Sequence, residues 1–150
     1  MDFSQIDPHL FQGTAPLTPR DIDLLRTLGV RATVDMRAEA DAHLPIECVL
    51  WLPTVDGEPA TVGQLVTGIQ FIDHCIRLGW GVYVYCLAGI GRSPMMVAAY
   101  LIGRRGMDAE EAIENIRQHR PQVNPSPFQM HAAEAAGQTF REVTQEPPPE

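Results

Sequence analysis

A cysteine, an arginine and a serine stand close together near the middle of this 150-residue chain, in a segment that reads YCLAGIGRS from position 85 to 93. Cys86 is followed by five residues and then by Arg92 and Ser93. A thiolate is a nucleophile, and a guanidinium fork fits two oxygens of a phosphate group. The neighbouring hydroxyl could donate to the sulfur when it leaves. These residue types at this spacing indicate phosphoryl transfer through a phosphocysteine.

The flanking sequence predicts how this segment is held. The apolar run 81–85 is typical of a buried strand, and 94–102 of a buried helix. A helix N-terminus has unpaired N–H groups and attracts anions, and Gly89 and Gly91 let the backbone curl around a ligand. The same donors, with Arg92, are expected to favour the thiolate of Cys86. A lone cysteine after a strand is more often a small core residue, but the whole pattern favours a site here. Cys75, in the middle of a predicted helix, is expected to be a core residue.

Hydrolysis of a phosphate ester also needs an acid. One carboxyl group can protonate the leaving oxygen and then activate the water that cleaves the phosphocysteine. Asp56 is the leading candidate because it follows a predicted strand in an irregular loop with Gly57 and Pro59. Glu58 and Asp35 compete for this role, and Asp56 could also be an ordinary turn residue.

Apolar patterns and breakers predict an α/β fold. Strands are expected at 9–12, 30–36, 48–52 (stopped by Pro53) and 81–85, with helices at 18–29, 61–78, 94–104, 108–119 and 126–142. This alternation predicts a single domain over 1–143, with a mostly parallel sheet flanked by helices on both faces; 144–150 would be a disordered Pro/Glu tail. Ligands of such folds bind beyond the carboxyl ends of the strands. The cysteine loop, the 35–37 turn and the Asp56 loop should therefore share one rim.

Composition narrows the function further. The net charge of −8 argues against nucleic acid as a partner. The chain has no lysine, which excludes Schiff-base chemistry and a Walker-A loop. No apolar run is long enough to span a membrane, and no signal peptide is visible, so we expect a reducing, cytoplasmic setting. The histidines lack ligand spacing, and we expect no metal and no cofactor.

The cysteine segment, together with Asp56 upstream of it, resembles the cysteine-based protein tyrosine phosphatase superfamily, in particular its small dual-specificity branch. The segments 6–13, 34–37 and 120–130 resemble flanking segments of that branch. The order of acid and cysteine is the reverse of that in the low-molecular-weight branch. The resemblance implies that Cys86 is the nucleophile, Arg92 the phosphate clamp, Asp56 the general acid and Ser93 an aid to the second step. It also implies a substrate-binding backbone made by Leu87, Ala88, Gly89, Ile90, Gly91 and Arg92.

One departure is that Tyr85 stands where this family usually has a histidine that helps to hold the loop and tune the thiol. The leading hypothesis is a protein phosphatase for phosphotyrosine, with phosphoserine or phosphothreonine as further substrates. One alternative is a phosphate-binding pseudophosphatase with negligible turnover. Another is a phosphatase of inositol lipids or other small phosphate esters. The neutral residues Leu87, Ala88 and Ile90 make multiply phosphorylated inositol lipids less favoured, because the phosphatases of this superfamily that act on them tend to have basic residues there. Rhodanese-like sulfur transfer is a third.

Several other residues have two interpretations. Arg37, His119 and Arg120 could supply positive charge at the rim, but each is more often a solvated surface residue. Cys48 could in principle trap Cys86 as a disulfide under oxidation.

Overall fold

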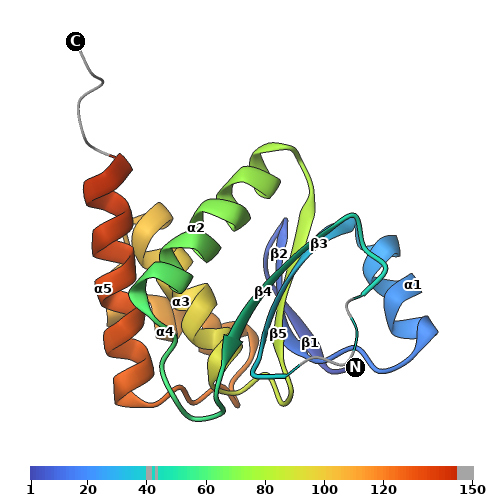
Figure 1. Ribbon diagram of the computed structural model, residues 1–150, viewed down its shortest axis with the longest axis horizontal. Coiled ribbons are helices and arrows are strands. Elements are labelled where there is room, and N and C mark those ends of the chain that lie inside the picture. Colours follow the sequence, from blue (N-terminus) through green and yellow to red (C-terminus); the bar gives the residue numbers. More distant parts are fainter. Residues whose placement is uncertain (40–41, 43, 145–150) are drawn as a thin grey trace.

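The computed structural model describes residues 1–39, 42 and 44–144. Its centre is a five-stranded sheet in the order β1-β2-β5-β3-β4 (Figure 1). β2, β5, β3 and β4 run parallel, and only β1 is antiparallel to its neighbour β2. The strands span Phe3–Asp7 (β1), Leu10–Thr14 (β2), Val30–Arg37 (β3), Cys48–Thr54 (β4) and Gly81–Cys86 (β5).

Helices cover both faces of the sheet, which confirms the predicted fold class. α1 lies alone on one face, whereas α2, α3, α4 and α5 pack together on the other (Figure 1). The helices span Pro19–Thr27 (α1), Val62–Arg77 (α2), Arg92–Arg105 (α3), Ala109–His119 (α4) and Pro127–Thr144 (α5). Thr18, Thr61 and Asp108 cap α1, α2 and α4 with reciprocal capping boxes, as their hydroxyl and carboxylate groups can satisfy free backbone N–H groups. None of the described helices is long and apolar enough to cross a membrane.

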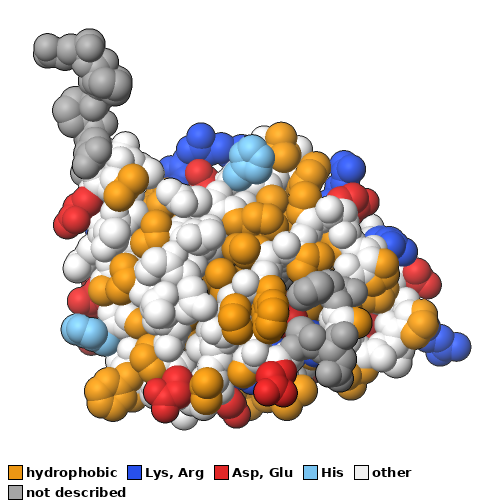
Figure 2. All heavy atoms as spheres, viewed as in Figure 1, with side chains coloured by type: hydrophobic (Ala, Val, Ile, Leu, Met, Phe, Trp, Pro, Cys, Tyr) orange, Lys and Arg blue, Asp and Glu red, His pale blue; other side chains and the backbone are white. Residues whose placement is uncertain are grey.

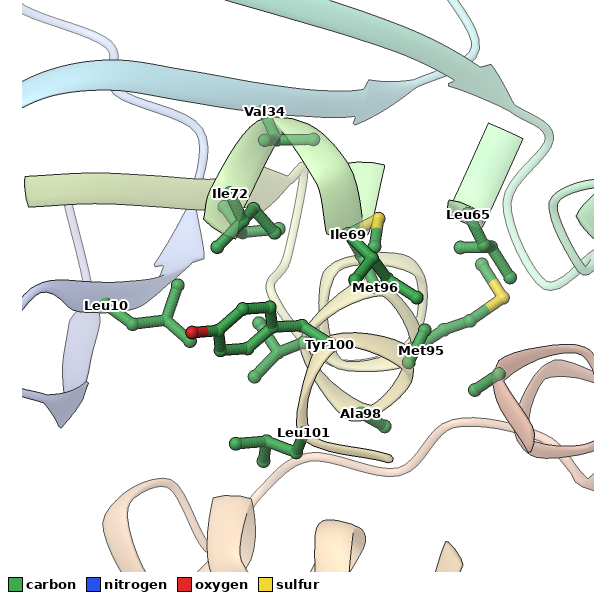
Figure 3. Packing of buried hydrophobic residues seen from close by; sticks show 14 of the residues in the cluster. Leu10, Val34, Leu65, Ile69, Ile72, Met95, Met96, Ala98, Tyr100 and Leu101 are labelled. Atoms are coloured by element: carbon green, nitrogen blue, oxygen red, sulfur yellow. The ribbon is translucent and has the colours of Figure 1, made fainter. Parts of the chain in front are cut away.

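The main hydrophobic core lies between the sheet and α3, which is buried on nearly every side from Arg92 to Ile102. Figure 3 shows Tyr100, Met95 and Met96 of α3 among side chains from the sheet and α2. A smaller core under α1 contains Tyr83 and Tyr85. Because successive residues of a strand point to opposite faces, Cys86 belongs to the main core and Tyr85 to the small one.

The structure differs from the expected strands at two places. It contains a second N-terminal strand, β1, where one strand at 9–12 was predicted. β4 also continues through Pro53 to Thr54, so the prediction that Pro53 stops this strand was wrong. Within the described residues β4 is an edge strand that pairs with β3 alone, and a proline without an N–H is tolerated there because no second ladder needs the donor.

The ends of two helices also differ from the prediction. α3 begins at Arg92, so Arg92 and Ser93 form its first turn and only 87–91 remain as the loop. α5 extends to Thr144, and residues 145–150 of the predicted tail lie outside the described residues.

A disulfide between Cys48 and Cys86 is incompatible with the strand register. Cys48 begins β4 opposite Ala32, and Ala32 in turn lies opposite Val82, four residues before Cys86 in β5. Four residues of strand separate the two cysteines by about 13 Å along the strands, in addition to the width of two strand spacings. A disulfide requires Cα atoms within roughly 7 Å.

Candidate active site

The loop 87–91 connects the carboxyl end of β5 to the N-terminus of α3 and forms the floor of a pocket. Gly89 has a φ of 67°, and a Cβ atom there would lie 2.6 Å from the carbonyl carbon of Gly13. Both the left-handed backbone and the close approach to β2 therefore require glycine. The tight loop turns the backbone toward the first turn of α3, where free N–H groups can bind an anion.

Cys86 lies at the base of this pocket with only 3% of its surface exposed. Its Sγ atom is 3.2 Å from Oγ of Ser93, and the backbone N–H of Ser93 donates to the same sulfur at 3.5 Å. The sulfur therefore faces the first turn of α3. Two hydrogen-bonding groups of one residue, the hydroxyl and the backbone N–H of Ser93, thus contact the sulfur.

Arg92 links the loop to the segment that carries Asp56. Its Nη1 donates to the carbonyl oxygen of Thr54 at 2.9 Å, and its Nε lies 3.6 Å from Oδ1 of Asp56. The guanidinium is buried, whereas the carboxylate is exposed. Asp56 and Arg92 both line the pocket with Cys86.

The two competing carboxylates are placed differently. Asp35 is fully buried on β3, and its oxygens accept three hydrogen bonds from the Arg37 guanidinium, at 2.8–3.2 Å, and one from the Arg37 backbone N–H at 2.9 Å. Glu58 lies in the same loop as Asp56, where its backbone N–H donates to the carbonyl oxygen of Val55 at 3.0 Å and its own carbonyl oxygen accepts from Gln129 at 3.1 Å. Neither side chain lines the pocket. The structure therefore brings only Asp56 of the three candidates to the sulfur and the guanidinium.

The pocket has a volume of about 320 Å³ and is largely neutral. Its lining consists of Asp56, Gly57, Cys86, Leu87, Ala88, Ile90, Gly91, Arg92, Asn124, Ser126 and Gln129. Arg92 is the one basic residue of that lining. Figure 2 shows hydrophobic and acidic side chains along the lower rim of the molecule, over the loops that follow β4 and β5 in Figure 1. The opening is thus suited to one phosphate group on an otherwise weakly charged carrier.

Arg120 corrects the sequence prediction, which treated it as a rim or surface residue. Only 1% of its surface is exposed, and it contacts the loop from beneath. Its Nε donates to the carbonyl oxygen of Gly89 at 3.0 Å and its Nη2 to that of Ala88 at 3.3 Å. In a trans peptide the C=O and N–H groups point in opposite directions. By holding two carbonyls away from the pocket, Arg120 turns the N–H groups of Gly89 and Ile90 toward it.

Gln12 is a second residue that the sequence reasoning did not identify. It is fully buried in β2, and its amide nitrogen donates to both Gly89 and Ser93. A polar residue directly after the apolar pair Leu10–Phe11 in a predicted strand was the available signal, but nothing in the sequence showed what it would contact. His119 is exposed and Arg37 pairs with Asp35, so neither lines the pocket.

Tyr85, which replaces the expected histidine, points away from the thiol. Its ring stacks on Tyr83 at 5.5 Å between centroids, and the Arg37 guanidinium lies 5.4 Å from its ring centroid. Burial, and next the carboxylate of Asp35, raise the pKa of the Tyr85 hydroxyl. The phenol is therefore neutral at physiological pH and occupies the small core under α1.

Comparison with known proteins gives a consistent result. The family model described as "Dual specificity phosphatase, catalytic domain" matches residues 10–136. The human protein named phosphatidylglycerophosphatase and protein-tyrosine phosphatase 1 is 35% identical over 141 residues, which cover 85% of this chain and 69% of that protein. The Arabidopsis thaliana phosphatidylglycerophosphate phosphatase PTPMT2 is 31% identical over 140 residues, 88% of this chain and 61% of its own length. Human dual specificity protein phosphatase 1 is 31% identical over 124 residues, 81% of this chain and 34% of its own length.

Solved structures agree in fold. PTPMT1 in complex with PI(5)P superimposes with a TM-score of 0.85 and 29% identity, covering 95% of this chain and 98% of that one. DUSP15 superimposes with a TM-score of 0.82 and 25% identity, covering 94% and 93%. The likeness in fold therefore extends over nearly the whole chain, and the family match over residues 10–136 includes the segment 86–93.

Proposed function

The chain belongs to the family of dual-specificity phosphatase catalytic domains, and on this premise we propose that it is a phosphomonoester hydrolase that works through a phosphocysteine. The observation that carries the proposal is the pocket itself. It holds a sulfur nucleophile, a buried guanidinium and an exposed carboxylate around a loop whose Ala88 and Gly89 carbonyls are held by Arg120. The activity follows from these groups in two steps.

In the first step the thiolate of Cys86 attacks phosphorus. The S–P bond forms while the bond from phosphorus to the ester oxygen breaks, and Asp56 supplies the proton that the leaving oxygen takes. Arg92 and the N–H groups of 87–92 bind the three non-bridging oxygens and stabilise their charge in the transition state. Asp56 is exposed and can therefore reach a leaving group above the pocket.

In the second step a water molecule attacks the phosphocysteine. Asp56, now a carboxylate, accepts a proton from the water while the oxygen of the water bonds to phosphorus. The S–P bond breaks with its electron pair on sulfur, which regenerates the thiolate and releases inorganic phosphate. Ser93, with its hydroxyl 3.2 Å from Sγ, is placed to stabilise the departing sulfur.

Phosphotyrosine in proteins is the first candidate substrate. A single guanidinium and neutral walls suit one dianionic phosphate carried on an aromatic ring. A reducing, cytoplasmic setting belongs to the same proposal, because an oxidised Cys86 could not act as the nucleophile.

A lipid that carries one phosphomonoester is the second candidate. Three exposed apolar residues, Val55, Leu87 and Ile90, lie in or next to the segments that line the pocket. Two of the relatives described above are named for phosphatidylglycerophosphate or its phosphatase activity. An inositol lipid with several phosphates fits less well, since the lining offers no second basic group.

The test is hydrolysis of p-nitrophenyl phosphate in excess chelator by wild type, Cys86→Ser and the matched control Cys48→Ser, whose cysteine is remote from the pocket. We expect activity in wild type and control and none in Cys86→Ser. Activity that survives Cys86→Ser would reject the mechanism. Phosphate binding with no turnover by wild type would indicate a pseudophosphatase, and a persulfide on Cys86 with cyanide turnover would indicate sulfur transfer.

The same proteins should then be assayed on phosphotyrosyl peptides and on vesicles that contain a lipid phosphomonoester. The ratio of kcat/KM for the two substrates assigns the class. A preference for the vesicles would replace the first candidate by the second.

A further inference from the structure

The side-chain amide of Gln12 connects two parts of the pocket. Gln12 lies in β2, fully buried, on the sheet face that packs against α3. Its Nε2 donates to the carbonyl oxygen of Gly89 at 3.0 Å and to Oγ of Ser93 at 2.8 Å. A carbonyl oxygen can only accept, so the amide must present its nitrogen to both atoms. The orientation of the amide group is therefore determined by its neighbours.

This contact decides how the Ser93 hydroxyl is used. A hydroxyl has one proton, and its oxygen can accept while the proton is donated elsewhere. Because Oγ accepts from Gln12, its proton is free to point at Sγ of Cys86, 3.2 Å away. A thiolate has no proton to donate, so the hydroxyl must be the donor in that pair.

We propose that Gln12 is a positioning residue for the second step, which orients the Ser93 hydroxyl as a donor to the sulfur that leaves phosphorus. The proposal rests on the phosphocysteine mechanism above. As water bonds to phosphorus and the S–P bond breaks, the electron pair moves to sulfur. A hydroxyl proton already directed at Sγ stabilises that developing charge without reorientation. In the first step the sulfur loses negative charge, so the same contact gives no advantage there.

A purely structural role does not explain Gln12. Its Oε1 is buried without a hydrogen-bond partner among the described residues, which is a cost to folding. If the Gln12 amide were removed, both of its partners, the Gly89 carbonyl oxygen and the Ser93 hydroxyl, would still have another hydrogen-bond partner. The Gly89 oxygen still accepts from Arg120 at 3.0 Å, and the Ser93 hydroxyl still contacts Sγ. An apolar residue at position 12 should therefore be at least as stable, and slower in catalysis.

The test compares wild type with Gln12→Met, which is close to glutamine in shape, and with Gln12→Leu as a second variant. Thr33→Val is the matched control, because Thr33 is equally buried in the sheet but has no contact with the pocket. Stopped-flow release of p-nitrophenol measures formation of the phosphocysteine as a burst and its breakdown as the steady state. Each burst equivalent corresponds to one S–P bond formed.

We expect the Gln12 variants to keep the burst rate within about twofold and to lose roughly tenfold in steady-state kcat, the order of one hydrogen bond. Their Tm should equal or exceed that of wild type, and Thr33→Val should be kinetically normal. Ser93→Ala should show the same defect, and the double variant should be no slower than Ser93→Ala alone.

If wild type shows a burst, two outcomes would overturn the inference about Gln12 and leave the proposed function standing. They are an unchanged kcat in the Gln12 variants, and additive losses of kcat in the double variant. A wild type that forms no phosphocysteine would instead overturn the proposed function. Mass spectrometry of the acid-quenched protein separates these cases, since it detects the phosphate on Cys86 directly.

Discussion

The Nε atom of Arg92 lies 3.6 Å from Oδ1 of Asp56, although 7% of the first side chain and 88% of the second is exposed. The pair therefore joins the buried floor of the pocket to a carboxylate in open solvent. An incoming phosphate would bind the guanidinium more strongly than one exposed carboxylate does, because it offers two oxygens to the fork. Asp56 would then be free to face the leaving oxygen above the phosphate.

Asp56→Asn is expected to slow substrates according to their leaving groups. An amide cannot donate a carboxyl proton, so kcat/KM for alkyl and phenyl phosphates should fall on the order of 100-fold. The kcat/KM for p-nitrophenyl phosphate should fall much less, because its leaving group needs little protonation. A series of aryl phosphates with wild type, Asp56→Asn and the control Glu58→Gln measures this. If the dependence on the leaving group is the same in all three, Asp56 is not the acid.

Arg120→Met is expected to disorganise the phosphate-binding loop. The carbonyl oxygens of Ala88 and Gly89 would each lose the hydrogen bond that they accept from Arg120. The Gly89 oxygen would still accept from Gln12. We expect a loss in kcat/KM on the order of 100-fold, typical of removing an oxyanion-binding donor. Phosphate and vanadate should also bind more weakly to the variant. His119→Gln, at the exposed neighbouring position, is the control. Near-normal kcat/KM in Arg120→Met would contradict a role in the loop.

Gly89→Ala should remove phosphate binding while leaving the rest of the fold intact. The added methyl group would overlap the backbone of Gly13, which cannot move without shifting β2, and the φ of 67° is unfavourable for alanine. Isothermal titration with vanadate and circular dichroism together measure this. Normal vanadate affinity in the folded variant would show that the loop tolerates a different backbone.

Tyr85→Phe should leave turnover within about twofold of wild type, with the same pH profile. The hydroxyl lies on the sheet face opposite Cys86, and burial followed by the Asp35 carboxylate raises its pKa, so it carries no charge near neutral pH. Steady-state rates across the neutral range test this. A large loss, or a displaced pH optimum, would show that the phenol tunes the thiol across the strand.

The sequence alone determined the local part of this site. Cys86, Arg92 and Ser93 belong to one strand–loop–helix unit, so their spacing and the two glycines between them already imply their proximity. The alternation of apolar runs likewise implied the α/β sheet. β1 and the passage of β4 through Pro53 were not predicted, because edge strands tolerate weak patterns and missing donors.

Only the tertiary structure decided the parts that come from distant segments. The sequence favoured Asp56 over Asp35 and Glu58 by its place in a loop after a strand but kept all three as candidates. Packing then buries Asp35 against Arg37 and brings Asp56 to Arg92. Arg120 reaches Gly89 across 31 residues, and Gln12 reaches it across 77. Such contacts depend on which elements pack together, so residue type and spacing could not reveal that a presumed surface arginine and an unremarked glutamine hold the loop.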